Sequence, residues 1–149
     1  MKKKIPRDGV IRIGNKKFDV HKKFLSLWSP YFKVFFSENW SKGRIHELNE
    51  EFFDAKIFKI VVKFLYGDNI FLKLNDSYTL CIAADYFQLP SLIERCERTM
   101  IKNVPKSDLI DLMKMIDLAL RLDLKDLKIQ NSIAFESSRK KTKKIDQLN

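Results

Sequence analysis

The sequence has few of the residues on which many functional sites depend. Among its 149 residues there are two cysteines, two histidines, four glycines and four prolines. Two cysteines cannot form a disulfide network or a zinc site of four thiolates, so we expect Cys81 and Cys96 to be buried, reduced thiols. The low glycine and proline content excludes collagen-like and linker-rich architectures.

Long hydrophobic runs are absent as well. No stretch reaches 18 consecutive apolar residues, and the lysines that follow Met1 lead into no hydrophobic segment of signal-peptide length. We therefore expect a soluble protein inside the cell, in the cytoplasm or the nucleus, without a membrane partner. Because 45% of the residues are apolar and 12% aromatic, a packed core is expected, and the length suits one domain with a short extension.

The net charge of +10 is concentrated at the two ends of the chain. Residues 1–7 carry four basic side chains and no acidic one, and residues 137–149 carry five basic side chains against one acidic. This leaves a nearly neutral charge of +2 for residues 8–136, so the basic residues are expected in mobile tails. Such a tail can direct nuclear import, contact polyanions or simply keep the chain soluble.

Patterns typical of catalytic sites are missing. His21 and His46 do not have the spacing of metal ligands, and the four glycines are too scattered for a phosphate-binding loop. Acidic pairs such as Glu50-Glu51 suit the first turn of a helix better than acid–base chemistry. We expect no enzymatic activity, no metal and no cofactor.

Hydrophobic periodicity predicts an α+β domain. Residues 10–13 and 16–20 alternate around Gly14-Asn15 and predict a hairpin. A helix is expected from His21, and Ser29-Pro30 is typical of the start of a second one. The remaining predictions are a strand at 45–48, an extended segment at 70–74, and helices starting at Asn49, at Asn75-Asp76, at Leu89-Pro90 and, as a final pair, after Pro105. In the first helix of that pair, five apolar residues make a heptad-like face: Leu109, Leu112, Met113, Ile116 and Leu120.

The segment Phe24–Phe36 is unusually apolar. Nine of its 13 residues are hydrophobic, and they do not fall on one helical stripe. A helix that is apolar on most sides needs a second surface to cover it. That surface is either another chain or the C-terminal helices.

These motifs together resemble the BTB/POZ domain family. Residues 18–36, with Phe18, His21-Lys22 and Tyr31-Phe32, are similar to the family's first long motif. Phe64–Gly67 resembles its helix end, and 83–89 together with Cys96-Glu97 resembles its last two helices. The resemblance implies four regions: a basic tail at 1–7, a BTB/POZ domain at 8–102, partial BACK-like helices of the kelch-type proteins at 103–136, and a disordered basic tail at 137–149.

The resemblance implies a small sheet, made of a hairpin and short strands, which is covered by helices. It also implies a protein-interaction module that homodimerises. Asp8 and Lys22 match the acidic and basic residues of a charged pocket in dimeric members. Leu25 and Trp28 are expected among the apolar contacts of such a dimer.

Many members of the family also dock onto a cullin scaffold as adaptors of a ubiquitin ligase. The docking loop carries a hydrophobic-x-Glu triplet, and here Phe36 precedes Trp40-Ser41-Lys42. The hydrophobic residue is kept and the acidic one is replaced by lysine. A dimerisation or decoy module without cullin docking therefore stays open. A nucleic-acid binder that acts through its basic tails is a third alternative, although the aromatic residues follow core spacing.

Overall fold

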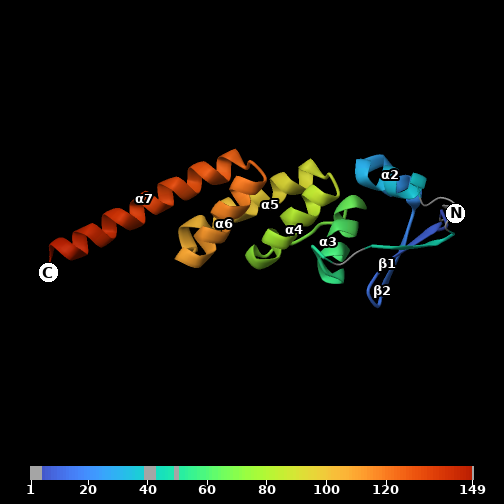
Figure 1. Cartoon of the computed structure of the whole chain (residues 1–149), viewed down its shortest axis with the longest axis horizontal. Helices are drawn as coiled ribbons and strands as arrows, with labels where there is room; N and C mark the ends of the chain where they lie inside the picture. Colours follow the sequence, from blue (N-terminus) through green and yellow to red (C-terminus); the bar gives the residue numbers. More distant parts are fainter. Residues whose placement is uncertain (1–4, 39–42, 49–50, 149) are drawn as a thin grey trace. The chain divides into compact units, whose positions relative to one another are not determined.

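The computed structural model describes residues 5–38, 43–48 and 51–148. Contacts divide the chain into two compact units, whose helices and strands are labelled in Figure 1. Unit 1 comprises residues 1–71 and 79–93, and unit 2 comprises residues 72–78 and 94–149. Strands and helices occur together, as the sequence predicted, and the strands all belong to unit 1 among the described residues.

Unit 1 contains a three-stranded sheet with the order β2-β1-β3. Strands β1 (Gly9–Ile13) and β2 (Lys16–Val20) form the predicted antiparallel hairpin, and β3 (Ile45–Glu47) runs parallel to β1. Gly14 lies at the turn with φ +53°, a conformation that favours glycine. Arg12 and Glu47 are register partners and form an ion pair across β1 and β3.

Ser29 separates the first two helices, α1 (Lys22–Trp28) and α2 (Pro30–Glu38). Its hydroxyl accepts a hydrogen bond of 3.2 Å from the backbone N–H of Phe32 and donates one of 2.7 Å to the carbonyl of Phe87. The first bond satisfies an N–H group that the start of a helix leaves unpaired. The predicted restart at Ser29-Pro30 is confirmed.

Helix α3 (Ala55–Leu65) begins later than the sequence predicted. Asp54 is its N-cap, and the Asp54 carboxylate accepts a bond of 2.9 Å from the N–H of Ile57. The prediction of a start at Asn49 is therefore wrong, and Asn49 itself lies outside the described residues. The predicted end is confirmed, because Gly67 has φ +77° and its N–H bonds the carbonyl of Phe64.

Helices α4 (Leu74–Tyr86) and α5 (Pro90–Asn103) contribute to both units, and a short 3-10 helix (Val104–Lys106) follows. Helix α4 starts just before its predicted caps, and the segment predicted as extended contains no strand. Gln88 adopts φ +55° between the two helices, where Leu89-Pro90 was predicted to break the chain. Cys81 and Cys96 are both buried thiols, as expected.

The core of unit 1 is aromatic. Phe32, Phe58 and Phe87 are fully buried. The Phe87 ring centroid lies 5.0 Å from that of Phe32 and 5.6 Å from that of Phe58. Such ring pairs add to the gain from burying apolar area. They hold α2, α3 and the end of α4 together and thereby fix the helices beside the sheet.

Unit 2 contains the helical hairpin α6 (Leu109–Arg121) and α7 (Lys125–Gln147). Asp108 caps α6 by accepting a bond of 2.8 Å from the N–H of Asp111. Of the heptad-like face predicted in α6, Leu112 alone is buried, and the other residues that α6 buries are Met115, Leu118 and Ala119. Apolar residues occupy more than one side of α6, so periodicity alone did not identify the buried side.

Helix α7 extends through the segment that the sequence predicted to be disordered. It buries Leu127 and Asn131 near its start, and every side chain from Glu136 to Leu148 is exposed. The segment 137–147 is described as helix, which agrees with its lack of glycine and proline. The domain boundaries stay a prediction. Among the described residues, no helix is both long and apolar enough to span a bilayer.

Candidate protein-interaction surface

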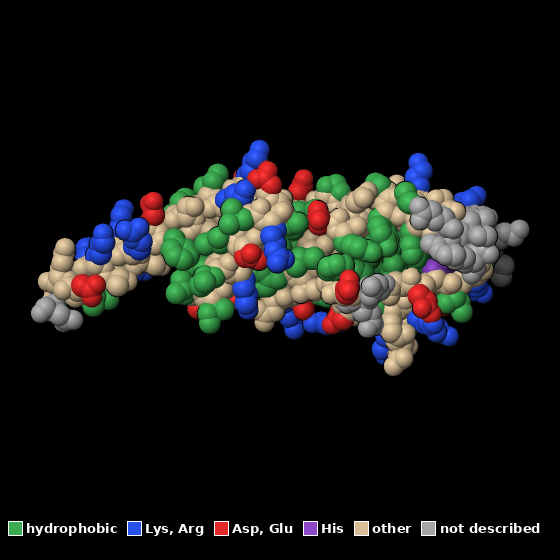
Figure 2. Space-filling view, viewed as in Figure 1, with side chains coloured by type: hydrophobic (Ala, Val, Ile, Leu, Met, Phe, Trp, Pro, Cys, Tyr) green, Lys and Arg blue, Asp and Glu red, His purple; other side chains and the backbone are tan. Residues whose placement is uncertain are grey.

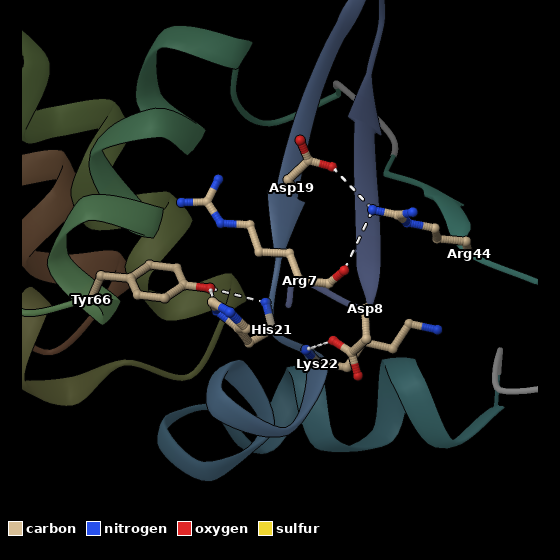
Figure 3. Close-up of polar contacts among 7 residues, drawn as sticks. All are labelled: Arg7, Asp8, Asp19, His21, Lys22, Arg44 and Tyr66. Carbon is tan, nitrogen blue, oxygen red and sulfur yellow. Dashed lines mark hydrogen bonds and ion pairs between the residues drawn. The ribbon is translucent and has the colours of Figure 1, made fainter. Parts of the chain in front are cut away.

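The segment before β1 is fixed to the start of α1 by Asp8. The Asp8 carboxylate accepts a hydrogen bond of 2.8 Å from the backbone N–H of Lys22 (Figure 3). His21, the N-cap of α1, makes no side-chain capping bond, so Asp8 provides an acceptor that α1 needs. The structure thus brings Asp8 and Lys22 together, as predicted, but through the main chain of Lys22.

The side chain of Lys22 is buried, with 7% of its surface exposed. Its stem crosses Gly9, where an added Cβ would lie 2.9 Å from Lys22 Cγ. Its ammonium group donates a bond of 3.3 Å to the carbonyl of Gly43 and lies 6.0 Å from the ring centroid of Phe36. Glycine at position 9 therefore gives the Lys22 stem its path into unit 1.

His21 links three parts of unit 1 through Tyr66 and Ile5. The backbone N–H of His21 donates to the Tyr66 hydroxyl at 2.9 Å, and His21 Nδ1 lies 2.9 Å from the same oxygen (Figure 3). His21 Nε2 lies 2.9 Å from the carbonyl of Ile5. Because a carbonyl only accepts, Nε2 carries a proton, and in the neutral ring Nδ1 then accepts from the Tyr66 hydroxyl.

Arg44 adds a weaker connection at the edge of the sheet. Its guanidinium group lies 3.4 Å from the carbonyl of Arg7 and 3.8 Å from the carboxylate of Asp19 (Figure 3). Both ion-pair partners are more than half exposed. Water therefore screens this pair, which contributes little to stability.

His46 on β3 is a buried polar side chain. It is 4% exposed, and its ring centroid lies 5.8 Å from that of Phe35 and 5.4 Å from that of Phe36. Its Nε2 has no hydrogen-bond partner among the described residues. Burial, together with the positive charge of Lys22, lowers the pKa of His46 below its ordinary value.

The outer face of α1 carries exposed apolar side chains. Leu27 is 76% exposed and Trp28 is 59% exposed. Leu27 borders a hollow of about 590 Å³ that is also lined by Lys22, Lys23, Ser26, Pro30, Lys33, Phe36 and Ser37. Trp28 borders a second hollow of about 320 Å³, between Phe64 and Pro90. We call Leu27 and Trp28 the α1 ridge.

The predicted interface residues differ in their burial. Trp28 is on the surface, as expected for a contact residue. Leu25 is completely buried within the chain, and the exposed leucine of α1 is Leu27; the dimer contact expected of Leu25 stays a prediction. Phe36, assigned to the docking loop, is 2% exposed. Trp40-Ser41-Lys42 lies outside the described residues.

The comparison with known families agrees with this arrangement of sheet, helices and motif residues. The sequence model of the BTB/POZ domain matches residues 1–104. The chain belongs to the BTB/POZ domain family. This family is a protein-interaction fold, and the resemblance drawn from the motifs is confirmed.

The curated relatives of this BTB chain are kelch-type proteins. Kelch repeat and BTB domain-containing protein 1 of vaccinia virus (strain Copenhagen) is 29% identical over 101 residues, which cover 68% of this chain and 18% of that protein. Kelch-like protein 40 of Xenopus tropicalis is 26% identical over 108 residues, or 72% of this chain and 18% of that protein. The chain thus spans less than a fifth of the relatives that it matches.

Solved BTB structures have the same fold. The BTB domain of zebrafish PATZ1 is 28% identical, covers 62% of this chain and 74% of its own, and gives a TM-score of 0.53. The BTB domain of human gigaxonin, at 21% identity and a TM-score of 0.54, covers 60% of this chain and 74% of its own and shows the fold alone.

Sequence reasoning missed two features of this BTB surface. It did not assign Tyr66 as the partner of His21, although Tyr66 was part of a quoted motif. It also did not identify Gly9, whose lack of a side chain accommodates Lys22. A glycine at the first position of a mostly apolar strand is the signal that could have indicated close packing.

Proposed function

We propose that this BTB chain is a homodimerising protein-interaction module, with the α1 ridge at the centre of its interface. The observation that carries the proposal is the exposure of Leu27 and Trp28 next to each other on one helix. Exposed large apolar side chains that gather at one place are typical of interaction sites.

The two hollows beside the ridge support a symmetric arrangement. In a two-fold dimer the same patch faces itself, so a ridge on one copy needs a complementary hollow on the other. Leu27 and Trp28 each border a hollow of unit 1. We propose that the ridge of one copy enters a hollow of the second copy.

Oligomeric state tests the proposal directly. The wild type should be dimeric by light scattering at roughly 100 μM, since such interfaces have micromolar or tighter affinity. Trp28→Lys should give a folded monomer, because it places a charge in an apolar interface. Phe71→Lys is the matched control: Phe71 is 87% exposed, also in unit 1, and its replacement should leave the dimer intact. A monomeric wild type would contradict the proposal.

We also propose that docking of a cullin scaffold is weakened by Lys42. The kelch-type relatives favour an adaptor role, and the replacement of the acidic residue of the docking triplet opposes it. A lysine only donates hydrogen bonds, whereas the acidic side chain accepts them. Losing a charged hydrogen bond costs about 1.5–3 kcal/mol.

Calorimetric titration of a cullin N-terminal domain distinguishes a cullin adaptor from a dimerisation or decoy module that does not dock. Lys42→Glu should bind roughly 10- to 150-fold more tightly than wild type. If neither protein binds, the module dimerises without docking. If the wild type binds at about 10 nM and Lys42→Glu has no effect, the triplet is not the determinant.

A further inference from the structure

Helix α6 of unit 2 presents an apolar stripe to solvent. Leu109 is 59% exposed, Met113 58% and Leu120 64%, and Ile116 between them is half-buried. Their spacing of four, three and four residues places them on one side of the helix. We call these four residues the α6 stripe, and Ile110, 64% exposed, lies beside it.

The stripe is distinct from the side of α6 that packs inside unit 2. That inner side consists of Leu112, Met115, Leu118 and Ala119, all of which are buried. Helix α6 is therefore apolar on two sides, and only one of them is covered within the described chain. A stripe with coiled-coil spacing is the surface that another amphipathic helix recognises.

The same unit carries a strongly basic segment at the end of α7. Residues 137–147 contain five basic side chains and one acidic, and all of them are exposed. Figure 2 shows the apolar side chains gathered over α6 and the basic ones on the last turns of α7. Both the apolar stripe and the positive segment of unit 2 are therefore exposed to solvent.

We propose that the α6 stripe and residues 137–147 form a docking surface for an acidic amphipathic helix of a partner protein. The apolar side of that helix covers the stripe, and its carboxylates face the lysines and arginine of α7. Charge complementarity of this kind speeds association and selects the partner. The surface belongs to unit 2 alone and is independent of the α1 ridge.

Charge decides between this occupant and the two alternatives. A second copy of the chain would bring two positive segments together, which disfavours self-association through α6. An anionic membrane would also attract the basic end of α7, but burying the stripe in it would bury Asp111 and Asp117 of α6 as well, whereas a partner helix can cover the stripe and leave both carboxylates in contact with water. An acidic helix satisfies both parts of the surface.

Designed peptides test the proposal on the full chain. The probe is a helix of about three heptads with leucine at positions a and d and glutamate at most other positions. The matched control peptide has lysine in place of glutamate. We expect the acidic peptide to bind with an affinity that falls as salt is raised, and the basic peptide to bind at least about tenfold more weakly.

Substitutions in the α6 stripe and in residues 137–147 test whether each part contributes to binding of the acidic peptide. Met113→Asp and, separately, Lys140→Glu with Lys143→Glu should each weaken the acidic peptide by about tenfold or more, while circular dichroism stays unchanged because all three side chains are exposed. Val34→Asp, at a side chain of unit 1 that is 53% exposed, should bind like wild type.

Three results would overturn the proposal. Equal binding of the two peptides would remove the role of charge. A dimer that Met113→Asp dissociates would assign the stripe to a second copy. Binding to vesicles of phosphatidylcholine and phosphatidylserine that Met113→Asp abolishes, without peptide binding, would assign the surface to a membrane.

Discussion

At the scale of single residues, His46 makes the stability of unit 1 sensitive to pH. Its folded-state pKa is below the ordinary value of 6.5, so the unfolded chain takes up a proton at this residue more readily than the folded chain. The stabilising effect of neutral His46 is therefore complete above about pH 6.5 and is lost as the pH falls through the folded pKa.

We predict that the free energy of unfolding decreases between pH 7.5 and pH 5.5, and that His46→Leu makes this decrease smaller. Leucine stays neutral and suits the space between Phe35 and Phe36. Urea denaturation of both proteins at several pH values measures the effect. An equal slope for the two proteins would contradict the assignment to His46.

Gly9 offers a second test at this scale. A methyl group there would lie 2.9 Å from Lys22 Cγ and 3.0 Å from Cε, so the buried stem must move. We predict that Gly9→Ala lowers the free energy of unfolding by about 1–3 kcal/mol. In the Lys22→Ala background the same change should cost less, because the clashing atoms are gone, and a double-mutant cycle gives the coupling. Additive effects would show that the two residues do not compete for space.

At the scale of elements, Ser29 joins α2 to the end of α4. Ser29→Ala removes the acceptor for the Phe32 N–H and the donor to the Phe87 carbonyl, and both groups are buried. We predict a loss of about 1–3 kcal/mol in the free energy of unfolding. The matched control is Ser37→Ala, since Ser37 is exposed and only its bond to Val34 is lost. A similar small loss for both variants would contradict a structural role of Ser29.

Elements with a strong local signal could be predicted from the sequence. Gly14 and Gly67 have positive φ angles, and Ser29-Pro30 combines a cap with a residue that suits the first helical position. The start of α3 was missed because several acidic residues precede it and only the folded geometry selects Asp54. The buried side of α6 was missed because its two apolar sides look alike until α7 packs on one of them.

The candidate surface could be predicted only in part for a related reason. The family resemblance pointed to Asp8 and Lys22, and the apolar segment 24–36 pointed to Trp28. Leu25 and Leu27 are chemically alike, and only packing shows which of them is buried. The path of the Lys22 stem over Gly9 depends on β1 and α1 meeting in space. Neither relation has a signature within a short stretch of sequence.

At the scale of the whole molecule, the last part of α7 differs from the rest of the chain in its exposure. Residues 137–147 bury no side chain, and lysines such as Lys140 and Lys144 stand four residues apart and repel each other. We predict that trypsin cleaves here in the native protein and leaves a resistant core that ends near residue 136. Removing 137–149 should leave the melting temperature unchanged. A resistant fragment that extends past Lys144 would contradict this prediction.

The hydrogen bonds of Asp8 and His21 couple the N-terminal segment to the proposed dimer interface. They tie the segment around Ile5 to the helix that carries the α1 ridge, so the order of that segment and the order of α1 are thermodynamically linked. In the dimer proposed above, a binder or a bulky fusion that draws Ile5 away from His21 should therefore reduce the affinity between two copies. By reciprocity, dimerisation will lower the affinity of such a binder by the same factor.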